Sequence, residues 1–426
     1  MSNLKNLGQS VIFIILFFNI CSYELEGSQP GITRDTGVVL LSGIVKDADS
    51  KQPVIFAHIL LEGTNIGTVS NTDGEFLLKI PASNINGNIF VTSLGYKNLV
   101  ISIPELQRIG NEIQLEITRY PIKELIVKQI NVIDLLNEVR RNIPRNYGIN
   151  PAMFTSFYRE TIKQNRNYVA VSEAVFDIYK APYTLFSEDD RIKIFKGRKS
   201  QNVEKMDTIL FKLQGGPYNL FILDVAKHFN EIIPDEYFGY YNFKYEGIES
   251  NQDRDVYIIS FDQKPDVHLP LYLGKVYIDI QTLAITVMEF SLSPYGINYA
   301  PSSMILKKPA GMRVEIPGAD YVVKYRFNNG TWVLSYARME ARFRCKWNRK
   351  LFRSNYITTS EMAVTNVDND SIVKFKMRES TRSTDIFSEI VSDFEDPDFW
   401  GDYNIIRPEI SIEEATEKLN RKIQRK

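Results

Sequence analysis

Residues 274–290 have the sequence GKVYIDIQTLAITVMEF. On either side of Gln281-Thr282, apolar and polar residues alternate, and β-branched residues are frequent. Alternation with a period of two places one set of side chains on each face of a strand. The segment therefore predicts two neighbouring antiparallel strands joined by a short turn, with one apolar and one polar face.

The same pattern extends over most of the second half of the chain. Strands are predicted at residues 154–163, 168–179, 240–246, 255–262, 275–280, 285–291, 320–327, 331–341 and 371–377. Asn328-Asn329-Gly330 is typical of a tight hairpin turn. A helical segment over residues 215–233 interrupts the strands, and its apolar side is predicted to hold Leu220, Leu223, Val225 and Phe229. We expect one large antiparallel sheet with a helical segment against it.

The N-terminal part combines short strands with turn residues and contains no helical pattern. Strands are predicted at residues 38–45, 56–61, 75–80, 88–93, 98–103 and 112–117. Asp73-Gly74 and the glycines between the strands supply the positive φ angles that tight turns need. Short strands at this spacing predict an all-β sandwich.

Four motifs in this part resemble a known family. They are Gly43-Ile-Val-Lys-Asp47, Glu62-Gly63-Thr64, Asp73-Gly74-Glu75-Phe76 and Ser93-Leu-Gly95-Tyr96, and they look like the carboxypeptidase-regulatory-like domain. The resemblance implies a transthyretin-like, seven-strand-type β-sandwich that is often found at the front of exported bacterial proteins. It implies no peptidase activity and no zinc site, because the regulatory module is separate from the enzyme.

The second half carries a further resemblance. The paired strands from Gly274 to Phe290 are similar to the outer-membrane lipoprotein-carrier fold, a curved antiparallel half-barrel with a few helices. Phe157-Tyr158-Arg159-Glu160, together with Asp396-Pro-Asp-Phe-Trp400-Gly-Asp-Tyr403, resembles a family of exported bacterial proteins of uncharacterised function that joins both modules. The expected fold class is therefore mainly β, a sandwich followed by a larger curved sheet.

The predicted organisation has five parts. They are a signal peptide over residues 1–22, the sandwich over 38–118, a linker with a short helix over 119–150, the curved sheet domain over 151–410 and a C-terminal helix over 411–426. The linker helix is expected to begin after a capping Asn131 and to end at Pro144. Ser411 and Glu414 form a capping box at the start of the last helix.

The first residues are typical of an export signal. The apolar run Val11–Phe18 would span about 12 Å as a helix, against about 30 Å of bilayer hydrocarbon. A basic Lys5 before it and small residues near Ser22 fit a secretory signal peptide; the alternative is a buried strand. Cys21 stands where a lipoprotein would carry its acyl chains, although the preceding Phe18-Asn19-Ile20 departs from that motif. Cleavage after Ser22 and lipidation at Cys21 both stay open.

Composition and missing motifs exclude several function classes. Lys and Arg total 51 and Asp and Glu total 52, so the chain lacks the basic excess on which nucleic-acid binding depends. Two cysteines and three histidines are too few for a disulfide framework or a thiolate zinc site, and no His pair has metal-ligand spacing. No P-loop, dinucleotide, G-x-S-x-G or H-E-x-x-H motif is present. We therefore predict no catalytic residue, no cofactor and no metal site.

One group of residues is a candidate ligand or partner surface. It consists of Phe157, Tyr158, Arg159, Glu160 and Trp400. Packing of the aromatic residues in a core is the favoured alternative, because such side chains each bury about 150–250 Å². Arg159 and Glu160 are neighbours on opposite strand faces, so they are not expected to pair with each other.

These observations predict a non-enzymatic binding or assembly protein of the envelope of a Gram-negative bacterium, in the periplasm or at the outer membrane. Its expected partner is a hydrophobic ligand or an outer-membrane protein, with peripheral or lipid-anchored membrane association. The alternatives are a cell-wall or glycan hydrolase that uses carboxylates not placed by the sequence, and an assembly partner of an outer-membrane transporter.

Intact-mass analysis of the mature protein after cell fractionation tests the export signal. We expect the chain in the envelope fraction, beginning either after Ser22 or at an acylated Cys21, because the apolar run is too short to remain as a membrane span. A mass that includes Met1–Ser22, in the cytosolic fraction, would contradict the prediction.

Overall fold

The structure is a computed structural model of the 426-residue chain. It describes residues 37–118, 130–184, 188–201, 212–213, 216–233, 235–251, 254–299, 305–307, 311–348, 353–393, 400–409 and 412. Residues from Gly37 onward form one compact unit. The predicted signal peptide with Cys21, most of the linker before the helix, and the C-terminal helix apart from Ile412 lie outside the described residues.

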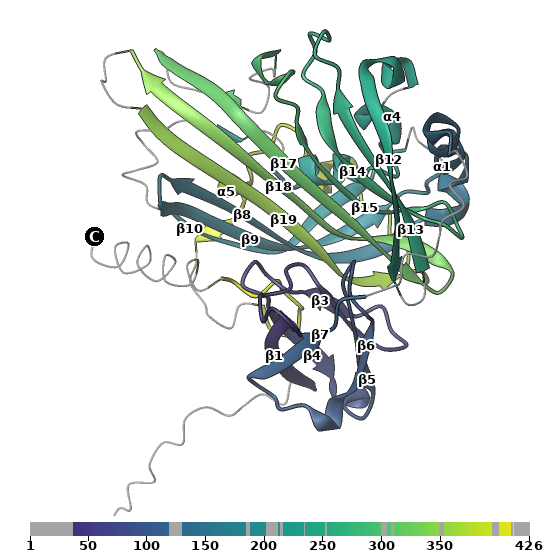
Figure 1. The fold of residues 1–426 in the computed structure, drawn as a ribbon. Helices are drawn as coiled ribbons and strands as arrows, with labels where there is room; N and C mark the ends of the chain where they lie inside the picture. The colour runs from purple at the N-terminus through teal and green to yellow at the C-terminus, as the bar shows by residue number, and fades with distance from the viewer. Residues whose placement is uncertain are drawn as a thin grey trace, which may run out of the picture. The chain divides into compact units, whose positions relative to one another are not determined.

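Seven strands in two sheets form the N-terminal sandwich (Figure 1). One sheet has the order β4–β1–β7 and the other has the order β3–β2–β5–β6. The strands are β1 Val38–Asp47, β2 His58–Leu61, β3 Gly67–Val69, β4 Glu75–Pro81, β5 Asn88–Thr92, β6 Leu99–Ser102 and β7 Asn111–Leu115. Alternate residues such as Phe76, Leu78 and Ile80 fill the space between the sheets. The predicted seven-strand sandwich is confirmed, although the three-residue β3 was not predicted.

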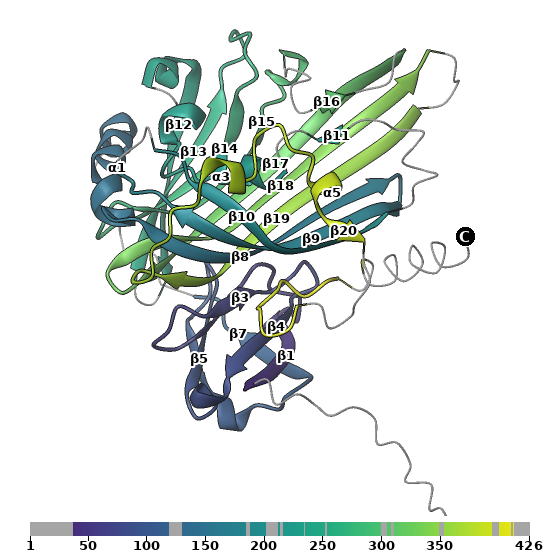
Figure 2. The same ribbon diagram turned by 180° about the vertical axis from the view of Figure 1, so that it is seen from behind.

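An eleven-stranded sheet forms the larger part (Figures 1 and 2). Its order is β12–β13–β14–β15–β17–β18–β19–β8–β9–β10–β20, and all neighbours are antiparallel except β10 and β20. Its strands are β8 Ala152–Gln164, β9 Asn167–Lys180, β10 Arg191–Gln201, β12 Tyr241–Asn251, β13 Arg254–Gln263, β14 Tyr272–Asp279, β15 Ile285–Leu292, β17 Met312–Asn328, β18 Thr331–Trp347, β19 Arg353–Asp368 and β20 Ser392–Asp393. A separate pair joins β11 Lys212–Leu213 to β16 Ile305–Lys307. The predicted mainly-β fold with one large, open antiparallel sheet is confirmed.

Helices cover one face of this sheet. They are α1 Val132–Tyr147, α3 Gly216–Ile222, α4 Phe229–Ile232 and α5 Phe387–Ile390, and Figure 2 shows α3 and α5 against the strands. Leu136 of α1, Leu220 of α3 and Phe387 of α5 share the main hydrophobic core with Val323 and Tyr325 of β17. Among the described residues, no helix has both the length and the apolar character needed to cross a membrane.

The opposite face of the large sheet contacts the sandwich. Phe56 and Val69 of the sandwich form one cluster with Phe157, Val175 and Tyr336 of the large sheet. Side chains on both faces of the central strands are therefore buried, and in β8 every residue from Ser156 to Thr161 is buried.

Helix α1 extends further than the sequence predicts. Asn131 caps its start, since its side chain accepts from the backbone N–H groups of Ile133 and Asp134. Pro144 does not end it, and the helix continues to Tyr147 before Gly148, whose φ is 111°. A proline removes one backbone hydrogen bond, and burial of Ile143 and Tyr147 against the sheet compensates for that loss near the helix end.

One strand prediction in the second half was wrong, and two long strands were missed. Residues 371–377 form no strand, whereas β10 and β19 were not predicted. Strand β19 buries Thr358, Ser360 and Glu361 between its neighbours, so its sequence lacks the apolar alternation that marks a strand with one exposed face.

The segment 400–409 connects the sandwich with the large sheet. Thr68 Oγ1 of the sandwich donates to the carbonyl of Ile405 at 3.0 Å, and Asn71 Nδ2 donates to the carbonyl of Arg407 at 3.1 Å. From the large sheet, Arg159 Nη2 donates to the carbonyl of Ile406 at 2.7 Å. The segment thus hydrogen-bonds to both β units through its backbone.

Strand β8 carries one buried charged residue on each face. Arg159 is 1% exposed on the sandwich side, where Nε lies 2.8 Å from Glu173 Oε1 and Nη1 lies 3.1 Å from Glu361 Oε1. Arg198 and Arg338 also bind these two glutamates, so the cluster pairs its buried charges. The sequence-based inference that Arg159 does not pair with its neighbour is confirmed.

Glu160 occupies the other face, where its hydrogen-bond partner among the described residues is neutral. The Tyr158 hydroxyl donates to Glu160 Oε2 at 3.0 Å. Burial raises the pKa of the Glu160 carboxyl to about 7, and the tyrosine hydrogen bond offsets only part of this rise. The neutral form is therefore favoured in the folded chain up to neutral pH.

Replacing Arg159 by methionine should lower the free energy of unfolding by about 3–5 kcal/mol, because Glu173 and Glu361 lose a buried partner. Urea unfolding measures the change. Arg342→Met is the matched control, since that side chain is 44% exposed, and it should leave the urea midpoint almost unchanged. Equal midpoints for the two variants would contradict the role of Arg159.

Replacing Glu160 by glutamine should change how stability depends on pH. The folded-state pKa of about 7 lies above the unfolded value, so Glu160 lowers stability as pH rises from about 4.5 to 7. Glu160→Gln should remove up to about 3 kcal/mol of this loss at pH 8 and have little effect at pH 4. Chemical denaturation at both pH values measures the difference, and a variant that is destabilised equally at both would count against the raised pKa.

Candidate functional site

The five residues predicted to form a binding surface are buried in the protein. Phe157, Tyr158, Arg159, Glu160 and Trp400 are each at most 6% exposed. The rings of Phe157 and Trp400 meet edge to face at 5.4 Å on the sandwich side, and the ring of Tyr158 lies 4.8 Å from that of Phe387 on the helix side. They therefore form no accessible surface in the structure, and the core-packing alternative describes the three aromatic residues.

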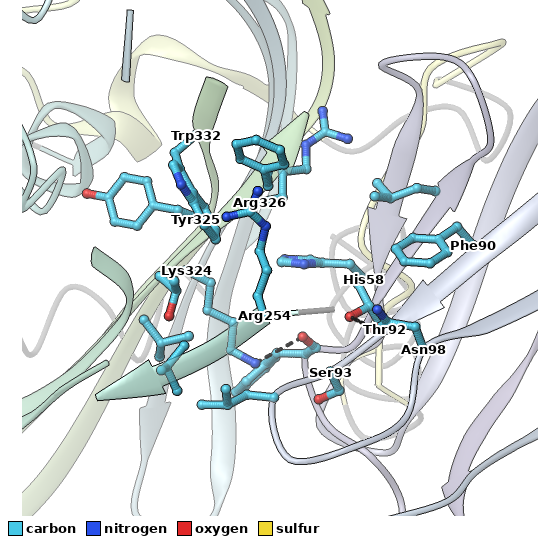
Figure 3. Close-up of a pocket in the computed structure, with 17 residues that line it drawn as sticks. His58, Phe90, Thr92, Ser93, Asn98, Arg254, Lys324, Tyr325, Arg326 and Trp332 are labelled. Carbon is cyan, nitrogen blue, oxygen red and sulfur yellow. Dashed lines mark hydrogen bonds between the residues drawn. The ribbon is translucent and has the colours of Figure 1, made fainter. Parts of the chain in front are cut away.

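A cavity of about 270 Å³ lies between the sandwich and the large sheet (Figure 3). In Figure 3 the side chains of His58, Phe90, Thr92, Ser93 and Asn98 lie on the sandwich side, opposite Arg254, Lys324, Arg326 and Trp332 of the large sheet, whereas the ring of Tyr325 points away from the sandwich. The other described residues that line it are Phe56, Leu60, Leu94, Val256, Thr286, Val287 and Phe327.

Strand register positions the sandwich wall. His58 of β2 pairs with Thr92 of β5, and Leu60 pairs with Phe90. Cross-strand partners point to the same side of a sheet, so these four side chains share the face that lines the cavity. The residue between them, Ile59, points into the sandwich core.

Strand β17 positions the opposite wall. Val323 and Tyr325 belong to the main core on the helix side. Since successive side chains of a strand point to opposite faces, Lys324 and Arg326 project toward the sandwich. The hairpin turn at Asn329-Gly330, where both φ angles are positive, holds the end of this strand against β18.

Lys324 and Arg326 are cations with neutral partners. Lys324 Nζ donates to the carbonyl of Phe56 at 3.1 Å, and Arg326 Nη2 donates to the carbonyl of Asn65 at 3.0 Å. Burial lowers the pKa of Lys324 to about 8 and that of Arg326 to about 10. Arg326 is 5% exposed, and its buried Nε has no hydrogen-bond partner among the described residues.

Arg254 differs from these two residues because its charge is balanced. Its Nη1 lies 3.0 Å from Oδ2 of the buried Asp279. The guanidinium also stacks on Phe327, with Cζ 3.7 Å from the ring centroid. None of the described lining residues is Asp or Glu, so the cavity itself offers no carboxylate to Lys324 or Arg326.

His58 is a neutral hydrogen-bond donor at the edge of the cavity. Its Nε2 lies 3.0 Å from Ser335 Oγ, and Ser335 Oγ donates its own proton to the carbonyl of Lys324 at 2.8 Å. The ring nitrogen must then carry the proton that it shares with the serine. Burial, together with the charges of Lys324 and Arg326, lowers the pKa of His58 to about 3. A histidine with such a low pKa is a poor base. His58 therefore does not activate the Ser335 hydroxyl as a nucleophile.

In a second set of buried charged residues, the negative and positive charges balance each other. Asp190 accepts from Lys180 at 2.5 Å and from Lys227 at 2.7 Å. Asp224 accepts from Lys180, Tyr183 and Tyr325 at 2.6 Å each. Because the carboxylates and ammonium groups balance, this set anchors the segment between α3 and α4 to the sheet. Asp396 and Asp398, which also stand close together in the sequence, lie outside the described residues.

The described part of the chain contains no group of side chains that could bind a metal ion. No three His, Cys, Asp or Glu side chains lie close enough there to hold a metal ion. Cys345 is buried in the main core, and burial raises the pKa of its thiol to about 11. The thiol therefore fills apolar space in the core and is a weak nucleophile at neutral pH.

Lys324 and Arg326, which line the cavity, were not among the site residues predicted from the sequence. Alternation in residues 320–327 places Lys324 and Arg326 on one strand face, and this pattern was the available signal. Their burial depends on the sandwich, which lies more than two hundred positions earlier in the sequence.

Comparison with known proteins gives weak similarity for the whole chain. No curated protein sequence matches it. Among solved structures, a DUF1329 family protein from Desulfovibrio piger aligns with 57% of this chain and 97% of its own, at 9% identity and a TM-score of 0.24. A protein from Bacteroides fragilis, described in terms of membrane association and unknown function, aligns with 78% of this chain and 99% of its own, at 9% identity and a TM-score of 0.16.

Lipovitellin aligns with 53% of this chain at 7% identity and a TM-score of 0.24, and the chain covers 26% of its length.

A family model gives a more specific result for the N-terminal part of the chain. Residues 41–127 match the model of the CarboxypepD_reg-like domain, over the strands that form the two sheets of the sandwich. The N-terminal sandwich is therefore a CarboxypepD_reg-like domain, as the motifs from Gly43 to Tyr96 predict.

Proposed function

We propose that this chain is a non-enzymatic binding protein of the bacterial envelope, and that its ligand occupies the cavity between the CarboxypepD_reg-like domain and the large sheet. The observation that carries the proposal is the cavity of about 270 Å³, which both β units line. Ligand pockets typically combine an apolar wall with a few convergent polar groups, and this cavity has that composition.

The apolar wall comes from both units. Phe56, Leu60 and Phe90 line it from the sandwich, and Val287 and Trp332 line it from the large sheet. Such a wall favours a compact apolar group, because each square ångström of apolar surface removed from water contributes about 25 cal/mol.

The helix-covered face is a less suitable place for a ligand. The sequence predicts a helical segment against the large sheet, and the face that it covers is the alternative place for a ligand. In the structure, side chains of α1, α3, α4 and α5 pack into the main core on this face. These residues fill the centre of this face, and the cavity of about 770 Å³ that remains lies at its edge, between α1 and the hairpin around Asn329.

A binding role also fits the chemistry of the cavity. The described residues that line it include no carboxylate and no cysteine, and the only histidine among them is neutral and held by Ser335. Such a set lacks the paired acid and base, or the activated nucleophile, that hydrolysis requires. The envelope location rests on the export signal in the sequence.

Filling the cavity should weaken ligand binding. We expect the neutral dye N-phenylnaphthylamine to bind the purified full-length protein saturably at one site, because its fused rings match the apolar wall. Leu60→Trp places a larger side chain in the cavity and should weaken binding by about tenfold or more. Fluorescence titration measures the affinity.

Leu40→Trp is the matched control, since Leu40 is 38% exposed on β1 in the other sheet of the sandwich. It should bind the dye as the parent does. Circular dichroism verifies that both variants are folded, and Thr92→Trp replaces Leu60→Trp if that variant unfolds. Absence of saturable binding to the parent, or equal binding by folded cavity variants, would refute the proposal.

A further inference from the structure

We propose that the cavity selects small amphipathic anions, whose carboxylate, sulfonate or phosphate group binds Lys324 and Arg326 while the apolar part lies against the aromatic wall. The inference rests on the proposed function and specifies the chemical class of its ligand. It follows from charge balance, hydrogen bonding and size.

Charge balance separates this cavity from the other buried charges. Arg159 has two carboxylate partners, and Arg254 has Asp279. Arg326 and the half-buried Lys324 instead donate to backbone carbonyls; neither has a salt bridge within 4.0 Å among the described residues, and Glu289 acts on Lys324 only from a longer distance. Burying a charge without an opposite charge is costly, so an anion in the cavity would remove an unfavourable interaction.

The hydrogen bonds of Arg326 also indicate an anionic ligand. The buried Nε of Arg326 has no partner in the described part of the chain, although a guanidinium has five donors in a fixed plane. Such a planar donor set matches the oxygens of a carboxylate or a phosphate. Asn98 and Thr92, which hydrogen-bond to each other at 2.7 Å, add neutral polar groups on the sandwich side.

Size limits the ligand to a small molecule. A volume of about 270 Å³ is near the lower end for ligand pockets. The cations and the aromatic residues line the same volume, so one molecule can contact both. A ring or short chain that carries one anionic group fits these conditions better than a free inorganic ion, which would leave the apolar wall uncovered.

The protonation of Lys324 links binding to pH. The charged and titratable groups around the cavity are His58 of β2, Arg254 of β13, Asp279 of β14, Glu289 of β15, and Lys324 and Arg326 of β17. Burial lowers the pKa of Lys324 to about 8, whereas that of His58 is about 3 and that of Arg326 about 10. Between pH 7 and 9 Lys324 is therefore the group that loses its charge, and anion affinity should fall over this range.

Two dyes with the same ring system test the proposal. Anilinonaphthalene sulfonate carries one negative charge, and N-phenylnaphthylamine carries none. At pH 7 the purified full-length protein should bind the anionic dye about tenfold more tightly, as a charge-assisted hydrogen bond predicts. Lys324→Met and Arg326→Gln should each remove most of this preference and leave the affinity for the neutral dye within about twofold.

Lys275→Met is the matched control. Lys275 lies on β14, is exposed, and does not line the cavity, so this variant changes the net charge equally and should retain the preference. In the parent the preference should fall between pH 7 and 9, and in Lys324→Met it should not. Inorganic phosphate at the same concentration as the dye should fail to displace it.

The outcomes separate the two proposals. If neither dye binds, the proposed ligand cavity is wrong. If both dyes bind with equal affinity, or if Lys275→Met lowers the preference as much as Lys324→Met does, the cavity binds ligands but the inferred selectivity for anions is wrong. Displacement by phosphate alone would overturn the requirement for an apolar part.

Discussion

Burial of the large sheet on both faces is the constraint on which the rest of the structure depends. Helices cover one face, and the CarboxypepD_reg-like domain with the segment 400–409 covers the other. In a sheet with one wet face, every second side chain can be charged at little cost. Here Arg159 of β8 and Lys324 and Arg326 of β17 point into protein on the sandwich side, and each one needs a partner within the chain or from outside it.

Whether a buried charged residue has a structural role depends on the groups that it binds within the chain. Arg159 and Arg326 lie on the same face of the sheet, and both are at most 5% exposed. Arg159 binds Glu173 and Glu361, so it stabilises the contact with segment 400–409 and leaves no charge for a ligand. Arg326 binds only the carbonyl of Asn65 among the described residues, next to a cavity. The same residue type thus has a structural role at one position and, in the proposal made above, a ligand-binding role at the other.

Sequence patterns predicted the parts of the fold that depend on local alternation. The hairpin around Asn329 and the sandwich strands follow from periodicity and turn residues, and the domain match at residues 41–127 agrees with the motifs. Strand β19 was missed because Thr358 and Glu361 are buried by long-range neighbours, which a single sequence does not reveal. The cavity was missed for the same reason, since His58 and Lys324 meet only after the two β units pack together.

This dependence on packing makes the contact between the units part of the site. His58 and Phe90 supply one wall and Lys324 the other, so separation of the units would remove the cavity and expose its cations to water. Segment 400–409 opposes separation, because its backbone accepts hydrogen bonds from Thr68 and from Arg159. An anion between the walls would oppose separation as well, since it would bind β17 while its apolar part contacts the sandwich. Ligand binding and the closed arrangement of the two β units should therefore stabilise each other, as any ligand that binds one of two states must favour that state.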